Sequence, residues 1–142
     1  MLRLVLVWLH LLSASVWIGW LLYGSHLIVP GLAGGERTYA SLLRQGRVIS
    51  ASALGLLAAT GLANWALLGL RSYWLMGKIV LVLLIVPLAV HRDFGLLPPA
   101  LRAIEEGREP RASLAGVRGI DRALVVLALV VLFLAVGVAR GR

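Results

Sequence analysis

The chain has 142 residues, of which 61% are hydrophobic and only 14% are charged. A soluble domain has roughly 45–50% apolar and about 25% charged residues, and a soluble fold of this length cannot bury such an excess of apolar surface. The composition therefore excludes a water-soluble enzyme and a nucleic-acid-binding module, and it indicates an integral membrane protein. We attribute the net charge of +8 to membrane topology and contact with anionic lipid headgroups. The absence of cysteine excludes disulfides and cysteine-ligated metal sites.

The first long stretch without a formal charge runs from residue 4 to residue 35 and contains Pro30. About 20 apolar residues are enough for a helix to cross a bilayer, and proline disfavours the continuation of a helix. We therefore predict a first membrane span at residues 4–29. A second uncharged stretch, of 23 residues, predicts another span at residues 48–70.

The third span is predicted from a length argument. Only 13 residues separate Lys78 from Arg92. At helical rise they cover about 20 Å, which is too short for a hydrocarbon core of about 30 Å. The helix must therefore begin near Ser72 and carry Lys78 inside it, which predicts a span at residues 72–92.

The fourth span is predicted from 17 uncharged residues at 123–139, the short end of the range for a membrane helix. We expect this helix to begin earlier, so that the span covers residues 114–139. Four spans with connections between them predict one all-α domain over residues 1–142. Its architecture is expected to be an integral membrane antiparallel four-helix bundle.

Two long connections are predicted on one side of the membrane, at residues 30–47 and 92–122. The second connection includes a short amphipathic surface helix at residues 98–107, begun by proline and ended by glycine. The two connections contain nine of the 14 lysines and arginines, and the opposite side contains five. The positive-inside rule then places both connections in the cytoplasm and both termini outside. The expected location is the inner membrane of a bacterial cell.

Three polar residues of the predicted spans lie at one depth. His10, Asn64 and Lys78 are each six residues from an end of their span, and up-and-down connectivity places those three ends on the same side. The three side chains therefore share a layer about 9 Å inside the membrane boundary. A lysine at the centre of a membrane helix costs roughly 3 kcal/mol, so a layer of this kind indicates a functional site.

Ser13 and Trp17 fall on the same helical stripe as His10. Together with Asn64 they are predicted to line a pocket, because small residues beside a histidine leave room for a flat ligand. The alternatives are plain helix packing, a histidine bonded to a neighbouring helix, and a Lys78 ammonium that extends to the interface.

His26 and His91 are predicted near the opposite end of the bundle. His26 is 16 residues from His10, which corresponds to about 24 Å along a helix, so the two cannot serve one metal centre. His26 and His91 are candidates for a second site or for copper, and solvation at the interface is the alternative.

The spacings His10-x6-Trp17 and Trp74-x3-Lys78 resemble those of the HemJ family, small membrane protoporphyrinogen IX oxidases. The resemblance implies that His10 and Lys78 bind heme b. The chain departs from that pattern at Tyr23–His26, where the family has a proline–arginine pair.

The same helices look similar to the CopD family of copper-resistance membrane proteins. The local matches are short motifs in the first three spans: Trp8–Leu12, Trp17–Gly19, Thr60–Leu62, Gly77–Ile79 and His91–Arg92. This resemblance implies copper transport or resistance, with His26, His91 and Met76 as contacts. Cu(I) sites favour cysteine, methionine and histidine, and this chain has no cysteine and two methionines.

Three functions remain open from the sequence. The first is a redox protein with heme b, in which His10 is an axial ligand and Lys78 is the opposite ligand or a partner of a heme propionate. Such a protein transfers electrons to or from a quinone, or oxidises a porphyrinogen as HemJ does. The second is copper handling of the CopD kind. The third is a non-catalytic bundle that stabilises a homo-oligomer or a larger membrane complex.

Overall fold

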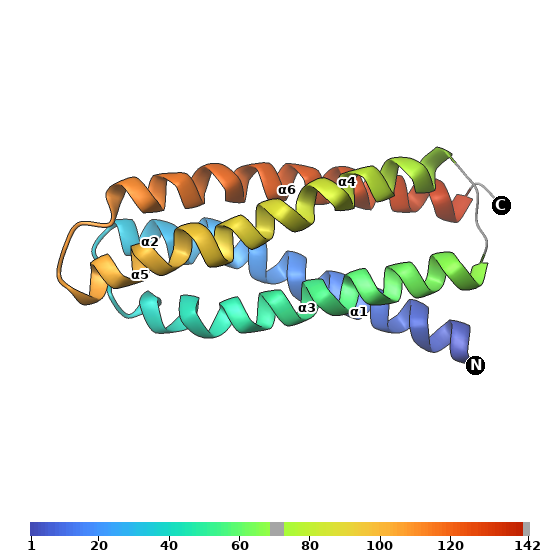
Figure 1. The fold of residues 1–142 in the computed structure, drawn as a ribbon, viewed down its shortest axis with the longest axis horizontal. Helices are drawn as coiled ribbons and strands as arrows, with labels where there is room; N and C mark the ends of the chain where they lie inside the picture. Colours follow the sequence, from blue (N-terminus) through green and yellow to red (C-terminus); the bar gives the residue numbers. More distant parts are fainter. Residues whose placement is uncertain (69–72, 141–142) are drawn as a thin grey trace.

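The computed structural model describes residues 1–68 and 73–140. Within these residues the chain is helical apart from short connections and contains no strand. Four stretches of the described chain are long and apolar enough to cross a membrane: Leu2–Ala33, Tyr39–Leu67, Tyr73–Glu105 and Arg111–Arg140. The predicted all-α class and the four helices of spanning length are therefore confirmed. The stretches run alongside one another, and both termini lie at one end of the molecule (Figure 1).

Two of the four stretches contain a turn of π-helix. The first stretch consists of α1 (Leu2–Tyr23), the π-turn η1 (Gly24–Ile28) and α2 (Val29–Ala33). The second is α3 (Tyr39–Leu68). The third consists of α4 (Tyr73–Val90), the π-turn η2 (His91–Leu96) and α5 (Leu97–Glu105), and the fourth is α6 (Arg111–Arg140). The main helix pairs are α1 with α3 and α4 with α6.

Pro30 does not end the first helix, contrary to the boundary predicted at residue 29. The Val29 N–H bonds to the carbonyl of Gly24, five residues back, which is the π-helical pattern. Pro30 follows in the first turn of α2. Proline has no N–H for the helical bond pattern, and the wider π-turn directly before it is where that pattern changes. The helix therefore continues to Ala33.

The third helix passes its predicted end at residue 92 in the same way. The Leu97 N–H bonds to the carbonyl of Arg92, five residues back, and Pro98 and Pro99 follow in the first turn of α5. A π-turn again precedes the prolines, and the chain stays helical as far as Glu105.

The connection predicted at 92–122 is therefore wrong over most of its length. Only residues 106–110 separate α5 from α6. The amphipathic helix predicted at 98–107 corresponds to α5, but it completes the third stretch instead of forming a separate surface helix. The connection predicted at 30–47 is also shorter, because α3 begins at Tyr39. The connection between the spans predicted at residues 48–70 and 72–92 lies outside the described residues.

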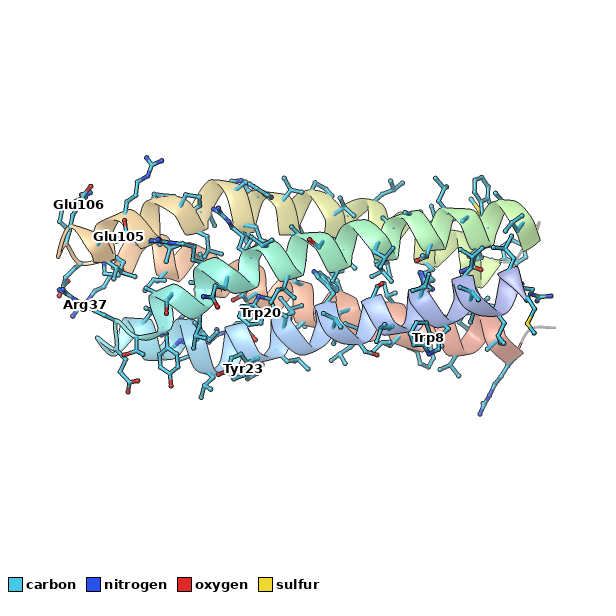
Figure 2. All side chains as sticks on the ribbon, turned by 90° about the horizontal axis from the view of Figure 1, so that it is seen from below. Trp8, Trp20, Tyr23, Arg37, Glu105 and Glu106 are labelled. Atoms are coloured by element: carbon cyan, nitrogen blue, oxygen red, sulfur yellow. The ribbon has the colours of Figure 1, made fainter. Side chains whose placement is uncertain are left out.

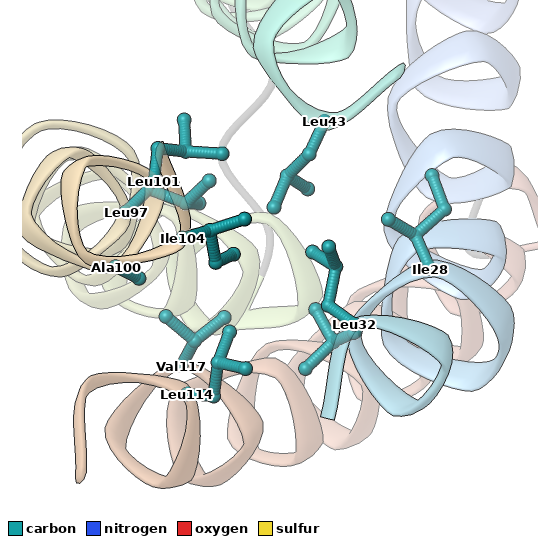
Figure 3. Packing of buried hydrophobic residues seen from close by; sticks show 10 residues of the cluster. Ile28, Leu32, Leu43, Leu97, Ala100, Leu101, Ile104, Leu114 and Val117 are labelled. Atoms are coloured by element: carbon teal, nitrogen blue, oxygen red, sulfur yellow. The ribbon is translucent and has the colours of Figure 1, made fainter. Parts of the chain in front are cut away.

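The interior contains two groups of buried hydrophobic residues, and each of the four helical stretches contributes to both. The end cluster lies near α2 and α5 and is drawn in Figure 3; it comprises Ile28, Val29, Leu32, Leu43, Leu97, Ala100, Leu101, Ile104, Leu114 and Val117. The central cluster comprises Trp17, Leu21, Ala53, Leu54, Ile85, Ala89, Leu124 and Ala128.

Charged side chains gather at the end of the molecule that contains α2 and α5. Figure 2 shows Arg37, Glu105 and Glu106 at this end, with Trp8 toward the other. Arg44 of α3 forms an ion pair with Glu105 of α5, so this end is also held by charges outside the core. An exposed pair of this kind contributes little, typically below about 1 kcal/mol.

Tryptophan rings lie directly against glycines at the two main helix contacts. The Trp20 ring of α1 occupies the space where a side chain at Gly46 of α3 would begin, and the Trp74 ring of α4 lies in the same way against Gly137 of α6. Close approach of two helices through a glycine is a common form of packing in membranes. Gly46 is therefore required by the ring beside it and not by its backbone conformation.

We predict that Gly46→Ala lowers the melting temperature of the detergent-solubilised protein. The new methyl group meets a rigid indole ring, and such overpacking costs about 2 kcal/mol. Gly55→Ala is the matched control, because it adds the same methyl group to the same helix where no atom lies within 4 Å. Equal melting temperatures for the two variants would contradict the packing described here.

Candidate functional site

The layer predicted around His10 includes a contact between α1 and α3. His10 Nδ1 lies 3.0 Å from the Thr60 hydroxyl oxygen, and both side chains are at least partly buried. Gly61 lies beside the same ring: a Cβ at this position would be 3.1 Å from His10 Cε1. The ring therefore fits against α3 because residue 61 has no side chain.

The Thr60 hydroxyl lies between the His10 ring and the backbone of its own helix, with the Leu56 carbonyl oxygen 2.7 Å away. When its single hydrogen is donated to that carbonyl, the hydroxyl accepts from His10 Nδ1–H. In this arrangement Nε2 has a free lone pair, which is the form of histidine that binds a metal or accepts a proton.

Lys78 of α4 is half-buried and lies close enough for its charge to act on the His10 imidazole. Asn64 lies one turn beyond Thr60 on α3, and its buried side-chain oxygen has no hydrogen-bond partner among the described residues. An unpartnered buried oxygen of this kind costs roughly 1–3 kcal/mol unless a ligand or water satisfies it. His10 and Thr60 are thus in contact, the charge of Lys78 acts on the His10 imidazole, and Asn64 supplies a free acceptor on the same helix as Thr60.

The other two predicted pocket residues are engaged in packing. Trp17 belongs to the central cluster, and the Ser13 hydroxyl donates to the Leu9 carbonyl of its own helix at 2.7 Å. Both side chains are buried. They support the helix that carries His10, and the Ser13 hydroxyl is bonded to the backbone of its own helix.

The remaining histidines are exposed. His26 Nδ1 lies 2.7 Å from the Ser25 hydroxyl and 3.1 Å from the Leu22 carbonyl, and the His91 ring lies against Gly95. Met76 is 15 residues from His91 in one helical stretch, about 22 Å away, so these residues do not meet at one copper site. The part of the chain that the structure describes has no group of three histidine, cysteine or acidic residues able to hold a metal ion. We therefore assign no metal to His26 or His91.

A second group of polar residues lies between the two apolar clusters. We call it the polar layer; it comprises Gly24 of η1, Ser50 of α3, Arg92 and Asp93 of η2, and Asp121 of α6. Arg92 is 2% exposed, Asp93 3% and Asp121 1%, so none of the three charged groups is solvated.

Arg92 bonds to both carboxylates of the polar layer. Its Nε donates to Asp121, its Nη2 lies 3.5 Å from the second Asp121 oxygen, and its Nη1 donates to Asp93 at 2.6 Å. The guanidinium lies beside Gly24, where a Cβ would be at an ordinary contact distance of 3.4 Å from Nη2. A planar fork of donors opposite a carboxylate is the geometry in which a buried ion pair is most favourable.

The sequence did not predict the polar layer, because Arg92 and Asp121 both fall within the connection expected at residues 92–122. The sequence of the last helix contains a spacing that predicts a buried carboxylate. Val117, Asp121 and Leu124 are spaced by four and three residues, which places the carboxylate on the buried stripe of a helix. An acidic residue on such a stripe indicates a buried partner.

We predict that Asp121→Asn strongly destabilises the protein. The substitution keeps the shape but removes the charge opposite the Arg92 fork, and breaking one partner of a buried pair costs about 3 kcal/mol or more. Thermal unfolding in detergent measures the loss. Glu109→Gln is the control, because its pair with Arg111 is exposed and 3.3 Å long. A melting temperature for Asp121→Asn as high as that of the control would show that the buried pair is dispensable.

Comparison with known proteins finds no match to this chain among protein-family models, curated proteins or solved structures. The residues and their geometry therefore carry the functional argument, with the motif spacings of HemJ and CopD as resemblances.

Proposed function

We propose that this protein is an antiparallel four-helix membrane bundle that binds heme b through His10 and serves a redox reaction. The observation that carries the proposal is the hydrogen bond from His10 to Thr60, which leaves Nε2 of a membrane histidine free as a ligand. Metal-binding histidines commonly donate their other ring N–H to an acceptor that fixes the tautomer, and Thr60 is such an acceptor here.

Lys78 is the second residue of the proposed site. As a neutral amine it would hold the heme iron, or as an ammonium it would pair with a heme propionate. Either role would offset the free-energy cost of placing the Lys78 side chain in hydrocarbon. The unpartnered Asn64 oxygen is a further acceptor on this side of the bundle.

Heme b would supply one-electron chemistry, and the residues around it would set its potential through ligation, hydrogen bonding and burial. The electron partner would be a quinone, or a porphyrinogen if the HemJ resemblance extends to activity. An apolar bundle gives such hydrophobic substrates access from the bilayer.

We predict that the protein purified from heme-replete cells shows a Soret band that His10→Ala abolishes or strongly reduces. Lys78→Met, which is of similar length but cannot ionise, should shift the band or loosen the heme. His26→Ala is the matched control, because this histidine is exposed and about 24 Å from His10 along the helix.

Thr60→Val, measured by the same heme spectrum, tests whether His10 binds the heme iron or only packs against α3. It keeps the shape of the side chain but removes the acceptor of the His10 Nδ1–H. We expect heme to stay bound with a changed midpoint potential. A colourless wild-type protein, or one whose heme survives His10→Ala and not His26→Ala, would exclude the proposed site.

We also propose that residues 34–38 and 106–110 face the bacterial cytoplasm and that both termini lie outside the inner membrane. The support is the excess of lysine and arginine on the side of these connections. A reporter that is active only in the cytoplasm should therefore be silent when fused after residue 142 and active when inserted at residue 107. The reverse pattern would invert the proposed topology.

A further inference from the structure

The polar layer contains more acidic than basic groups. One guanidinium, that of Arg92, lies between the carboxyl groups of Asp93 and Asp121, and all three side chains are buried. If every group were ionised, the layer would have one uncompensated negative charge in a region with apolar clusters on both sides. An unpaired buried charge is strongly disfavoured, and neutralisation by a proton is the usual outcome.

Arg47 and His26 are basic residues near the polar layer, but neither neutralises its excess negative charge through an ion pair among the described residues. Arg47 of α3 acts on Asp93 through its charge, but among the described residues the two form no ion pair. The Arg47 guanidinium instead lies over the exposed Phe94 ring, 5.6 Å from its centre. His26 of η1 acts on Asp121 from an exposed position.

The two carboxyl groups differ in their partners. Asp121 receives two groups of the Arg92 fork, and Asp93 receives one. The Ser50 side chain is a further hydrogen-bond partner of Asp93. A guanidinium can only donate, whereas a hydroxyl can donate to a carboxylate or accept from a carboxylic acid. Only Asp93 therefore has a partner that suits both its ionised and its protonated form.

We propose that Asp93 is a proton-binding site inside the bundle, where it takes up and releases one proton between Ser50 and the ionised Arg92–Asp121 pair. Uptake converts the carboxylate to the acid, which bonds to Ser50, and leaves the layer neutral. Release returns the proton toward Arg47 and the surface beside Phe94, where the positive guanidinium stabilises the carboxylate. The proposal does not depend on heme, since none of these residues belongs to the His10 layer.

The first test compares two isosteric variants in thermal unfolding of the detergent-solubilised full chain. Asparagine imitates a protonated aspartate in shape and charge, so Asp93→Asn should melt close to the wild type. Asp121→Asn should melt much lower, because it removes the ionised partner of Arg92. If the three charges were only a permanent ionic lock, both variants would be destabilised alike, and that result would overturn the proposal.

The second test detects the proton directly. Infrared spectra of the wild type in lipid nanodiscs at neutral pH should contain the carbonyl band of a protonated, buried carboxyl group. The band should disappear in Asp93→Asn, persist in Glu109→Gln and change frequency in Ser50→Ala. Transfer to D2O should shift it, because the proton exchanges with the surface.

Each spectroscopic outcome decides the assignment. Absence of the band in the wild type, its persistence in Asp93→Asn, or its failure to shift in D2O would each refute an exchangeable proton on Asp93. If Asp93→Asn fails to fold, Ser50→Ala still tests the proposal. An unchanged frequency of the carbonyl band in Ser50→Ala would show that no protonated Asp93 is bonded to Ser50.

Discussion

The ion pair between Arg92 and Asp121 is the constraint on which the packing of the helices depends. Both groups are withdrawn from water, and their attraction offsets the cost of desolvation only when the guanidinium fork and the carboxylate face each other. Apolar packing in a membrane specifies register weakly, because lipid solvates apolar side chains as well as protein does. The pair therefore fixes α6 against η2. Gly24 of η1 lies beside the guanidinium, and Ser50 of α3 bonds to Asp93, so all four helical stretches meet at this layer.

Arg92 and Asp93 are consecutive residues of the π-turn η2, and both side chains are buried. This turn is closed by the bond from the Leu97 N–H to the Arg92 carbonyl and is wider than a turn of α-helix. In η1 the equivalent turn begins at Gly24, which lies beside the Arg92 guanidinium. Each π-turn is followed by a helix with proline in its first turn, and each π-turn contributes residues to the polar layer.

Much of the fold follows from the sequence, because the cost of polar groups in hydrocarbon is readable from composition and spacing. The four helices of spanning length are the example, whereas the site at His10 and Lys78 stays a prediction. The limits of the helices were not readable, because charged residues were taken to end a span. Arg92 and Asp121 instead lie inside helices, each neutralised by a partner distant in sequence. The Thr60 hydroxyl as the partner of His10 likewise required a three-dimensional contact between α1 and α3.

The two polar regions are separated by a barrier that restricts what can pass between them. Lys78 and Arg92 are 14 residues apart in one helical stretch, a distance of about 21 Å. Between them Ile85 and Ala89 contribute to the central cluster, whose close-packed apolar side chains offer no hydrogen-bond partner to a moving proton. Proton exchange at Asp93 therefore does not pass through the central cluster, and the end cluster blocks the path along the bundle in the other direction. The remaining path is the one toward Arg47 and the surface beside Phe94. The His10 layer lies on the side of the barrier where the termini are, so electron transfer there would occur apart from proton binding at Asp93.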